Sequence, residues 1–523
     1  MTRALLIVCA IAAAASAAVI HVPSEQPTIQ DGLNAAQSGD TVLVAPGFYK
    51  ENITWPGRDG ISLIGEYGRD TTFIDGDTMG VCVTIGSGIT RATVIQGFTI
   101  TRGKVTTNSG SGIVCSDGSP SILDNRVTRC QGAGIHLSSY SANFGPLVRG
   151  NEISGCWKEI PGSWNYGAGI SVTSGNAAAH PEICYNWIHH DSLRRGAWNY
   201  GAGIFCDGNA LVYQNLVQEN VAAAEPGDNG RGAPGIYVDL GSCPLILSNL
   251  IVGNRNVTDA WKYGGGITME VNSKAIILNN TIVDNYCAPG MWSWGGGIYN
   301  YINCTTYVKN NIIANNQAGN GSAIYNYSGS VVNLMHNDYY NNSLSGCSPG
   351  PGDITLDPLF VTGGYRLSQT AAGQPQTSPC VDAGDTLLPV YGLDLDSLLR
   401  SWTTRTDSVA DQGTLDIGYH YPAEMMIGTA EPAPPAPASR SLVIAPNPSR
   451  AGFVTLSAPV LRRSNGPVTV SIYDATGRLV RSWSLEIGGW SFPLDLQFMQ
   501  SGVYLVKLSA GESTASQRLV VQR

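Results

Sequence analysis

Charged side chains are scarce in this chain, and they are unevenly distributed. Asp, Glu, Lys and Arg make up 13% of the 523 residues, and the net charge is -9. From Ser441 onward, Lys and Arg outnumber Asp and Glu by eight to four, so the excess of acid lies in the long body before it. Such a body lacks the basic surface that a phosphate backbone attracts. We therefore expect no nucleic-acid partner, and cations or neutral polymers are favoured as ligands.

Closely spaced cysteine pairs are also lacking. The 12 cysteines are scattered along the chain, which argues against a zinc site and against a small disulfide scaffold. Cys130 and Cys156 take equivalent positions in two successive repeats, each five residues after a recurring Asn. Either a disulfide or a pair of stacked free thiols fits that arrangement.

Long apolar runs are confined to the N-terminus. No later stretch reaches the roughly 18 residues that a membrane-spanning helix needs, so we expect no transmembrane segment in the mature chain. The opening MTRALLIVCAIAAAASA combines one Arg, an apolar run and the small residues Ala15, Ser16 and Ala17. This pattern predicts a secretory signal peptide over residues 1–17 and an exported protein.

Glycine is abundant, and it recurs within one motif. GSWNYGAGI, GAWNYGAGI, AWKYGGGI and MWSWGGGI all end on an isoleucine that belongs to a longer series. Steps of 22 to 35 residues separate the members of this series, which are Ile113, Ile135, Ile170, Ile204, Ile236, Ile267, Ile298 and Ile324. Self-similarity at this spacing is typical of a solenoid.

A second series of asparagines runs beside the isoleucines. Its members are Asn125, Asn151, Asn186, Asn215, Asn249, Asn280, Asn311 and Asn337. The repeats also contain short β-branched runs and almost no helical period, so each predicts several short strands. We infer a parallel β-helix, in which every strand pairs with its equivalent about 4.8 Å away and inward asparagines bond to the coils above and below.

On these features the sequence resembles the right-handed parallel β-helix family, also called the pectin-lyase-like fold, from about Val19 to Tyr421. VPSEQPTIQDGLNAAQSGDTVLVAPGFYKENI is similar to the family's N-terminal cap, with a short helix from about Ile29 to Ala36. DPLFVTGGYRL, SPCVDAGD and DIGYHY are similar to its closing segments. The fold hosts lyases, hydrolases, esterases, epimerases and adhesins, so the resemblance implies a fold and no single activity.

The end of the chain has a different pattern. EPAPPAPASR, within residues 422–440, predicts a stiff linker, and the alternating strands of residues 441–523 predict a small antiparallel β-sandwich. APNPSRAG, IYDATGRLV and SGVYLVKL are similar to the C-terminal sorting domain of the bacterial type IX secretion system. This resemblance implies the type IX machinery as a partner and an extracellular or cell-surface location in a Gram-negative-type bacterium. The predicted fold class is thus all-β, with a right-handed parallel β-helix and N-terminal cap over residues 18–421 before the linker and sandwich.

Side-chain alternation along a strand places the candidate site. The ladder isoleucine and the second residue after it should point inward, and the first and third residues after it outward. Asp207, Asp239 and Glu270 hold the third position in three successive coils. Carboxylates in such a row repel one another unless a cation bridges them, one is protonated or solvent screens them. As Ca²⁺ ligands they would suit a cation-assisted lyase, as an acid/base pair they would suit a glycoside hydrolase, and a solvated acidic face is the structural alternative.

Aromatic residues surround this row in the sequence pattern. Some hold the outward positions, and others lie in the turn that feeds the acidic strand. Aromatic faces beside carboxylates suit a sugar ring and its hydroxyls. The predicted sugar-binding residues are Phe205, Tyr237, Tyr299, Tyr301, Trp198, Tyr200, Trp261 and Tyr263.

One repeat interrupts the aromatic turn. Gly230 and Gly232 take the aromatic positions there, which predicts a groove entrance beside Asp239. Arg231 and Lys262 both lie five residues before their ladder isoleucines, and they are the candidate bases for a lyase. Solvated loop residues explain them equally well.

Two functions remain open from the sequence. The first is a secreted or surface-displayed β-helix that binds and cleaves polysaccharide, as a lyase or a glycoside hydrolase. The second is a non-catalytic surface or adhesion protein whose residue columns only stabilise the solenoid. The two differ in whether an acid or base lies within reach of the carboxylates.

Overall fold

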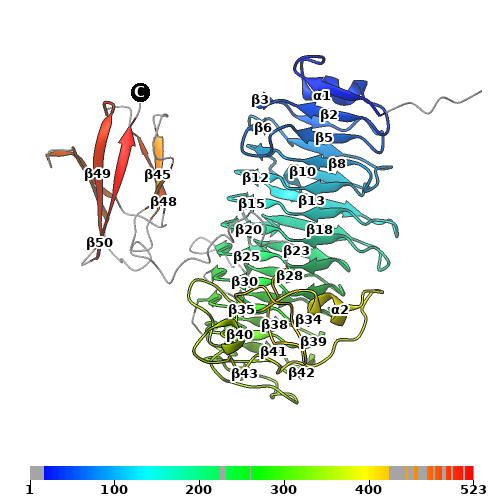
Figure 1. The fold of residues 1–523 in the computed structure, drawn as a ribbon, viewed down its shortest axis with the longest axis vertical. Coiled ribbons are helices and arrows are strands. Elements are labelled where there is room, and N and C mark those ends of the chain that lie inside the picture. Colours follow the sequence, from blue (N-terminus) through cyan, green and yellow to red (C-terminus); the bar gives the residue numbers. More distant parts are fainter. Residues whose placement is uncertain are drawn as a thin grey trace, which may run out of the picture. The chain divides into compact units, whose positions relative to one another are not determined.

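Three long parallel sheets form the main body of the protein. The computed structural model describes residues 17–223, 231–258, 261–288, 290 and 292–422, and in the C-terminal part residues 443–445, 453–457, 468–474, 478–485, 491–495, 499–510 and 513–521. Sheet A has 12 strands, from β1 (Val19–Val22) to β42 (Val331–Met335), and sheet B has 10, from β3 (Gly47–Lys50) to β40 (Ile312–Ala314). Successive coils stack along one axis (Figure 1). The predicted parallel β-helix is confirmed.

Sheet C carries the ladder isoleucines. Its 11 strands are β4 (Ile53–Thr54), β7 (Val83–Ile85), β10 (Gly110–Ser116), β13 (Ala133–Ser139), β18 (Ile170–Ser174), β23 (Ile204–Asp207), β28 (Ile236–Val238), β33 (Ile267–Met269), β38 (Ile298–Asn300), β41 (Ile324–Asn326) and β43 (Leu344–Ser345). Ile204 pairs with Ile236, and Ile236 with Ile267, so the ladder predicted from sequence spacing is the real register. The second residue after each, such as Cys206 or Val238, is also buried in the core, as predicted.

The asparagine series lies inside the solenoid. The Asn125 amide donates to Asn151 Oδ1 at 3.2 Å, and the Asn215 amide to Asn249 Oδ1 at 3.0 Å. The ladder continues to Asp353, whose Oδ1 accepts the amide of Asn337. Each rung thereby satisfies backbone and side-chain groups that the turn would otherwise leave unpaired.

The N-terminal cap contains the predicted short helix. The helix α1 (Ile29–Ala35) begins at its predicted residue, and the Thr28 side chain accepts a hydrogen bond from the Asp31 amide as its N-cap.

Cys130 and Cys156 are both buried free thiols in the structure. No helix of the described residues is long and apolar enough to cross a membrane.

Two further sheets form a layer outside sheet C. Sheet D consists of β16 (Trp157–Glu159), β21 (Ser192–Arg194), β26 (Val221–Ala223), β31 (Arg255–Val257) and β36 (Tyr286–Cys287). Sheet E consists of β17 (Trp164–Tyr166), β22 (Trp198–Tyr200), β27 (Arg231–Ala233), β32 (Lys262–Tyr263) and β37 (Ser293–Trp294). Five consecutive coils thus insert a pair of short strands immediately before their sheet C strand.

Glycine is required where sheet E turns into sheet C. Gly167 has φ of +54°, a conformation that favours glycine over residues with a Cβ. A Cβ atom on Gly169 would lie 2.5 Å from the carbonyl oxygen of Gly203 in the next coil. The recurring Trp-x-Tyr-Gly-x-Gly-Ile motif therefore encodes a sheet E strand, a tight turn and close stacking of coils.

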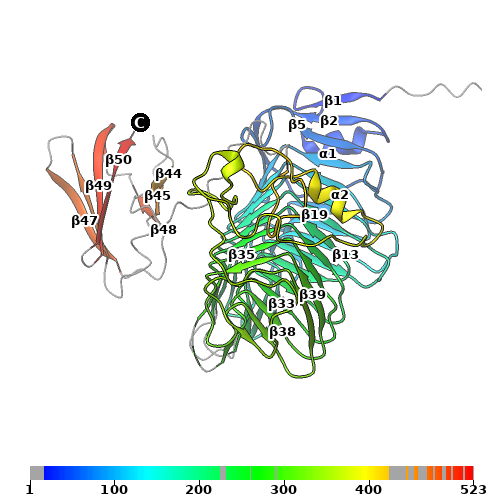
Figure 2. The same cartoon turned by 60° about the horizontal axis from the view of Figure 1, so that its bottom comes forward.

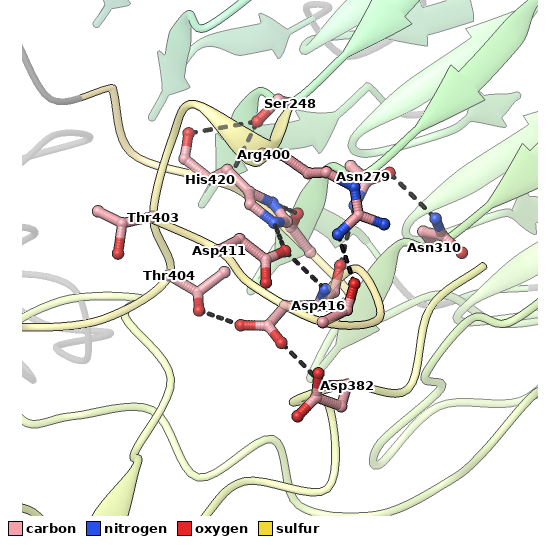
Figure 3. A network of polar contacts seen from close by, with 12 residues as sticks. Ser248, Asn279, Asn310, Asp382, Arg400, Thr403, Thr404, Asp411, Asp416 and His420 are labelled. Carbon is pink, nitrogen blue, oxygen red and sulfur yellow. Dashed lines mark hydrogen bonds and ion pairs between the residues drawn. The ribbon is translucent and has the colours of Figure 1, made fainter. Parts of the chain in front are cut away.

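The segment after the last coil runs back along the outside of the solenoid. Residues 355–421, which we call the strap, include η1 (Thr370–Ala372) and α2 (Leu395–Arg400) and lie against the outside of the solenoid (Figure 2). Their apolar side chains pack on outward residues of sheets A and B. Polar contacts complete the attachment (Figure 3). The His420 amide donates to Ser248 Oγ at 3.0 Å, and Asn279 Nδ2 donates to the Asp416 carbonyl at 3.0 Å. The closing segments predicted from the sequence form this outer cover.

The C-terminal part is a separate compact unit. Its antiparallel strands run from β44 (Val443–Ala445) to β50 (Ser513–Val521) and form a three-stranded and a four-stranded sheet. The predicted linker at residues 422–440 lies outside the described residues except for residue 422.

Candidate functional site

The three predicted acidic residues occupy matched positions at the ends of neighbouring sheet C strands. Asp207 ends β23, Asp239 follows β28 and Glu270 follows β33. Cys206 pairs with Val238 and Val238 with Met269, so each acid comes directly after a register-matched residue. Adjacent coils in such a sheet lie about 4.8 Å apart.

Burial and mutual repulsion perturb the two aspartates. Burial, followed by the charge of Asp239, raises the pKa of Asp207 to about 6. Burial also raises the pKa of Asp239. Both residues remain partly exposed. The pair can therefore hold a proton near neutral pH at a position that solvent can reach.

Glu270 differs from the two aspartates because its carboxylate is buried and accepts a hydrogen bond from a tyrosine. The residue is 8% exposed, and the Tyr237 hydroxyl donates to Glu270 Oε2 at 2.6 Å. The carboxylate thus supports the position of Tyr237. A direct catalytic or metal-binding role for Glu270 stays a prediction. The hydrogen bond with Tyr237 does not favour this role, because it already occupies one carboxylate oxygen.

The predicted equivalence of Arg231 and Lys262 is wrong. Arg231 pairs with Trp198, whereas Lys262 pairs with Gly232 and with Ser293, so the two basic residues stand in different columns of sheet E. Strand alternation places Lys262 on the opposite face of β32 from Tyr263. Since Tyr263 stacks on Tyr299 of sheet C at 4.9 Å, the Lys262 side chain faces away from sheet C and is poorly placed as a base.

Most of the predicted sugar-binding aromatics are buried, which corrects their expected exposure. Sheet E covers the outward face of sheet C, and the two sheets interleave their rings. Tyr200 stacks on Tyr237 with ring centres 4.3 Å apart and an interplanar angle of 13°. The residues with less than 5% exposure are Phe205, Tyr237, Tyr299, Tyr200 and Tyr263. In this conformation they stabilise the layer and cannot touch a ligand.

The tryptophans of sheet E are the aromatic residues that solvent reaches. Trp164 and Trp198 stack at 5.1 Å, and Trp261 and Trp292 stack at 5.5 Å with an interplanar angle of 5°. Trp164, Trp261 and Trp292 are 49%, 38% and 48% exposed. Trp198 is partly exposed, as is Tyr301, the next member of the acidic row.

The predicted gap in the aromatic column exists, although with other residues than expected. In β27, Arg231 takes the place of Trp198 and Ala233 that of Tyr200, because the inter-coil pairing is shifted by one residue relative to the sequence alignment. Gly230 lies outside the described residues, and the Arg231 side chain is likewise not described. The gap stands in the coil of Asp239.

Tyr166 belongs to the site, and it was not among the predicted site residues. Burial is the main cause of the raised pKa of Tyr166, and the charges of Asp239 and Asp207 raise it further. Its ring centre is 4.8 Å from that of Phe205. The signal was present in the motif itself, since Tyr166 is the tyrosine of the first Trp-Asn-Tyr-Gly copy.

The described residues of the acidic row contain no metal cluster. Within the ranges that the structure describes, no three His, Cys, Asp or Glu side chains come together in a way that could hold a metal ion. Two hollows of about 430 and 250 Å³ lie elsewhere, beside Phe144 and beside Asp411. Calcium binding by Asp207, Asp239 and Glu270 stays a prediction, and these residues do not form a preorganised calcium cage.

The matches of this chain to solved structures are distant in sequence. A search of curated proteins found none that matches the chain. Among solved structures, a PL6 family alginate lyase, AlyGC, and a mutant of the same enzyme are each 14% identical, with TM-scores of 0.31 and 0.32. The alignments cover 69% and 72% of this chain and 57% and 59% of those enzymes, so the chain matches little more than half of their length.

Family models cover both units of the chain. The model of the right-handed β-helix region matches residues 47–231 and 149–311, and the model of the secretion system C-terminal sorting domain matches residues 443–522. The sorting domain shows that the protein is secreted by the type IX system and is extracellular or on the cell surface. The chain belongs to the right-handed β-helix family and carries a type IX sorting domain at its C-terminus.

Proposed function

We propose that the protein binds a polysaccharide along the acidic row and hydrolyses it with Asp207 and Asp239. The observation that carries this proposal is the pair of partly exposed, register-matched aspartates with raised pKa values. Asp207, with a pKa of about 6, is suited to donate a proton to the glycosidic oxygen. Asp239 in its ionised form is suited to attack the anomeric carbon.

The spacing of the pair favours a retaining reaction. Carboxyl groups about 5 Å apart form and then hydrolyse a glycosyl-enzyme intermediate, whereas a wider separation leaves room for water in an inverting reaction. Coils about 4.8 Å apart meet the first condition. Asp207 gives its proton to the leaving group in the first step. In the second step the Asp207 carboxylate would accept a proton from the water that releases the sugar from Asp239.

The placement of Lys262 favours hydrolysis over elimination with this residue as the base. A lyase needs a base at the sugar carbon and a cation that stabilises the uronate, and Lys262 faces away from sheet C. The exposed pairs Trp164–Trp198 and Trp261–Trp292 lie in the coils on either side of the gap at Ala233. They offer edges and outer faces on which sugar rings can stack.

The test is release of reducing ends from a panel of uncharged and uronate polysaccharides by the secreted protein. We expect Asp207→Asn and Asp239→Asn each to lower activity at least 100-fold, while Asp124→Asn, on an exposed carboxylate of another coil, leaves activity unchanged. An unsaturated product with ultraviolet absorbance would instead identify a lyase. Binding without any cleavage, unaffected by both substitutions, would contradict the proposal.

A second function has its own supporting observation. The buried rings of Tyr200, Tyr237, Tyr263 and Tyr299 act as packing between sheets C and E, as a purely structural column would. We therefore keep a non-catalytic surface-binding protein as the alternative. It predicts ligand binding that depends on Trp261 and Trp292 and that tolerates loss of both aspartates.

A further inference from the structure

The first strand of the solenoid is held by a carboxylate at its start. β1 is the edge strand of sheet A and pairs with β2 (Thr41–Val44), and both lie beside α1 at one end of the body (Figure 2). The backbone nitrogen of Ala18 donates to Asp40 Oδ1 at 2.8 Å. The Thr41 amide donates to the Ala18 carbonyl at 2.9 Å, which closes the first ladder bond of β1.

Asp40 is a carboxylate whose described partners are all backbone groups. Its Oδ2 accepts the Gln37 amide at 2.7 Å, and the residue is 8% exposed. Hydrogen bonds from Ala18 and then from Gln37 lower the pKa of Asp40, so it carries a negative charge at neutral pH. Across the described residues, no Lys, Arg or His side chain forms an ion pair with it.

Ala18 is also the residue that the predicted signal-peptide cleavage would expose. Ala15, Ser16 and Ala17 form the small-residue site, and Ala17 and Ala18 are exposed. Hydrolysis of the Ala17–Ala18 peptide bond consumes one water, leaves a carboxylate on Ala17 and converts the Ala18 nitrogen into an α-ammonium group. That nitrogen is the atom already 2.8 Å from Asp40.

We propose that removal of the signal peptide after Ala17 creates an ion pair between the new α-ammonium of Ala18 and the Asp40 carboxylate, and that this pair fastens β1 onto sheet A. The precursor can offer only a neutral peptide N–H at this position. The mature chain offers a charged donor, and charge-assisted hydrogen bonds are the stronger kind. Maturation would thereby complete the N-terminal cap of the solenoid.

The geometry makes the effect specific to one cleavage position. A chain that begins at Ala17 keeps the Ala18 N–H bond to Asp40 but moves the positive charge about 3.5 Å along the chain. A chain that begins at Val19 lacks both the bond and the Ala18 carbonyl that Thr41 uses. These two chains are matched controls that contain no substitution.

The experiment has two parts. Mass spectrometry of the protein exported by its native cells should show Ala18 as the first residue. Hydrogen exchange of the Thr41 amide should be about 2–5-fold slower in the chain that begins at Ala18 than in the chain that begins at Ala17. When both chains also carry Asp40→Asn, the difference in exchange rate between them should vanish, because asparagine has no negative charge to pair with the α-ammonium group. Any other effect of the substitution is common to both chains.

Either of two results would overturn the proposal. One is a different N-terminus on the exported protein. The other is equal exchange of the Thr41 amide in the Ala18 and Ala17 chains. The catalytic proposal would be untouched by both, since Asp40 lies in the cap and not in the acidic row.

Discussion

The Nε2 atom of His420 lies 2.8 Å from Oδ2 of Asp411, and both side chains are buried (Figure 3). The same Asp411 oxygen accepts the Asp416 amide at 2.9 Å, and His420 Nδ1 lies 3.0 Å from the Gly418 carbonyl oxygen. Since the His420 amide is bonded to Ser248, this pair connects the interior of the strap to the solenoid.

Loss of one partner should loosen the strap. Removing one member of a buried pair leaves the other unsatisfied, so we expect His420→Ala or Asp411→Ala to lower the free energy of strap opening by about 3–5 kcal/mol. Hydrogen exchange of strap amides such as Thr403 measures this locally, because unfolding of a long solenoid need not be two-state. Asp407→Asn, which breaks the exposed contact with Arg405, is the control and should have a much smaller effect. Equal effects of the three substitutions would rule out a special role for the buried pair.

Asp191 takes a position that asparagines hold in the following coils. Its amide donates to Asn220 Oδ1 at 3.0 Å and its Oδ1 accepts the Cys156 amide at 2.7 Å, as an asparagine there would. Its Oδ2 is buried without a hydrogen-bond partner among the described residues. Burial raises the pKa of Asp191 well above its ordinary value. We infer a protonated carboxyl group, because an ionised oxygen cannot replace the amide donor of a ladder rung.

Asp191→Asn should therefore stabilise the protein at neutral pH. The Asp191 carboxyl group has a higher pKa in the folded chain than in the unfolded chain. Above about pH 4 it loses its proton in the unfolded chain but keeps it in the folded chain, so the stability of the wild type falls as the pH rises. We expect a gain of about 1–3 kcal/mol at pH 7 and little change at pH 3, visible as a higher melting temperature. The reverse change, Asn220→Asp, should destabilise at pH 7. A loss of stability in Asp191→Asn at pH 7 would contradict this account.

The Asp207 titration tests the site without an activity assay. Its pKa of about 6 has burial as the main cause and Asp239 as the second. Asp239→Asn should lower the pKa of Asp207 part of the way toward its ordinary value, and carbon-detected NMR of the carboxyl group can follow it. In the wild type, activity that needs the protonated acid should decline above pH 6. An Asp207 pKa that does not respond to Asp239→Asn would show that the two groups do not interact.

Calcium is the test of the remaining lyase hypothesis. The proposed hydrolysis by two carboxyl groups needs no metal ion, so it predicts that calcium leaves the melting temperature of the wild type and of Asp239→Ala unchanged. Magnesium at the same ionic strength controls for screening. A rise that calcium alone produces and that Asp239→Ala removes would instead establish an ion at the row and favour uronate polymers.

Much of the solenoid could be predicted because the same short-range pattern of residues determines every coil. Alternation along a strand determines which residues face inward, so Cys206, Val238 and Met269 were assigned correctly from the isoleucine ladder alone. The asparagine column was predictable for the same reason, since one polar residue at an equivalent turn in every coil requires equivalent partners. The acidic row follows from the same register.

The tertiary structure decided which outward residues solvent can reach. Tyr237 and Tyr299 point away from the core, as the alternation predicts, and yet sheet E covers them, which depends on how the strands before each glycine turn fold back. The relation of Arg231 to Lys262 could not be obtained by counting back from an isoleucine, because hydrogen bonds between coils set the register. The sequence by itself determined the period and inner face of the solenoid through strand alternation, whereas packing between distant segments decided the exposure of its outer face.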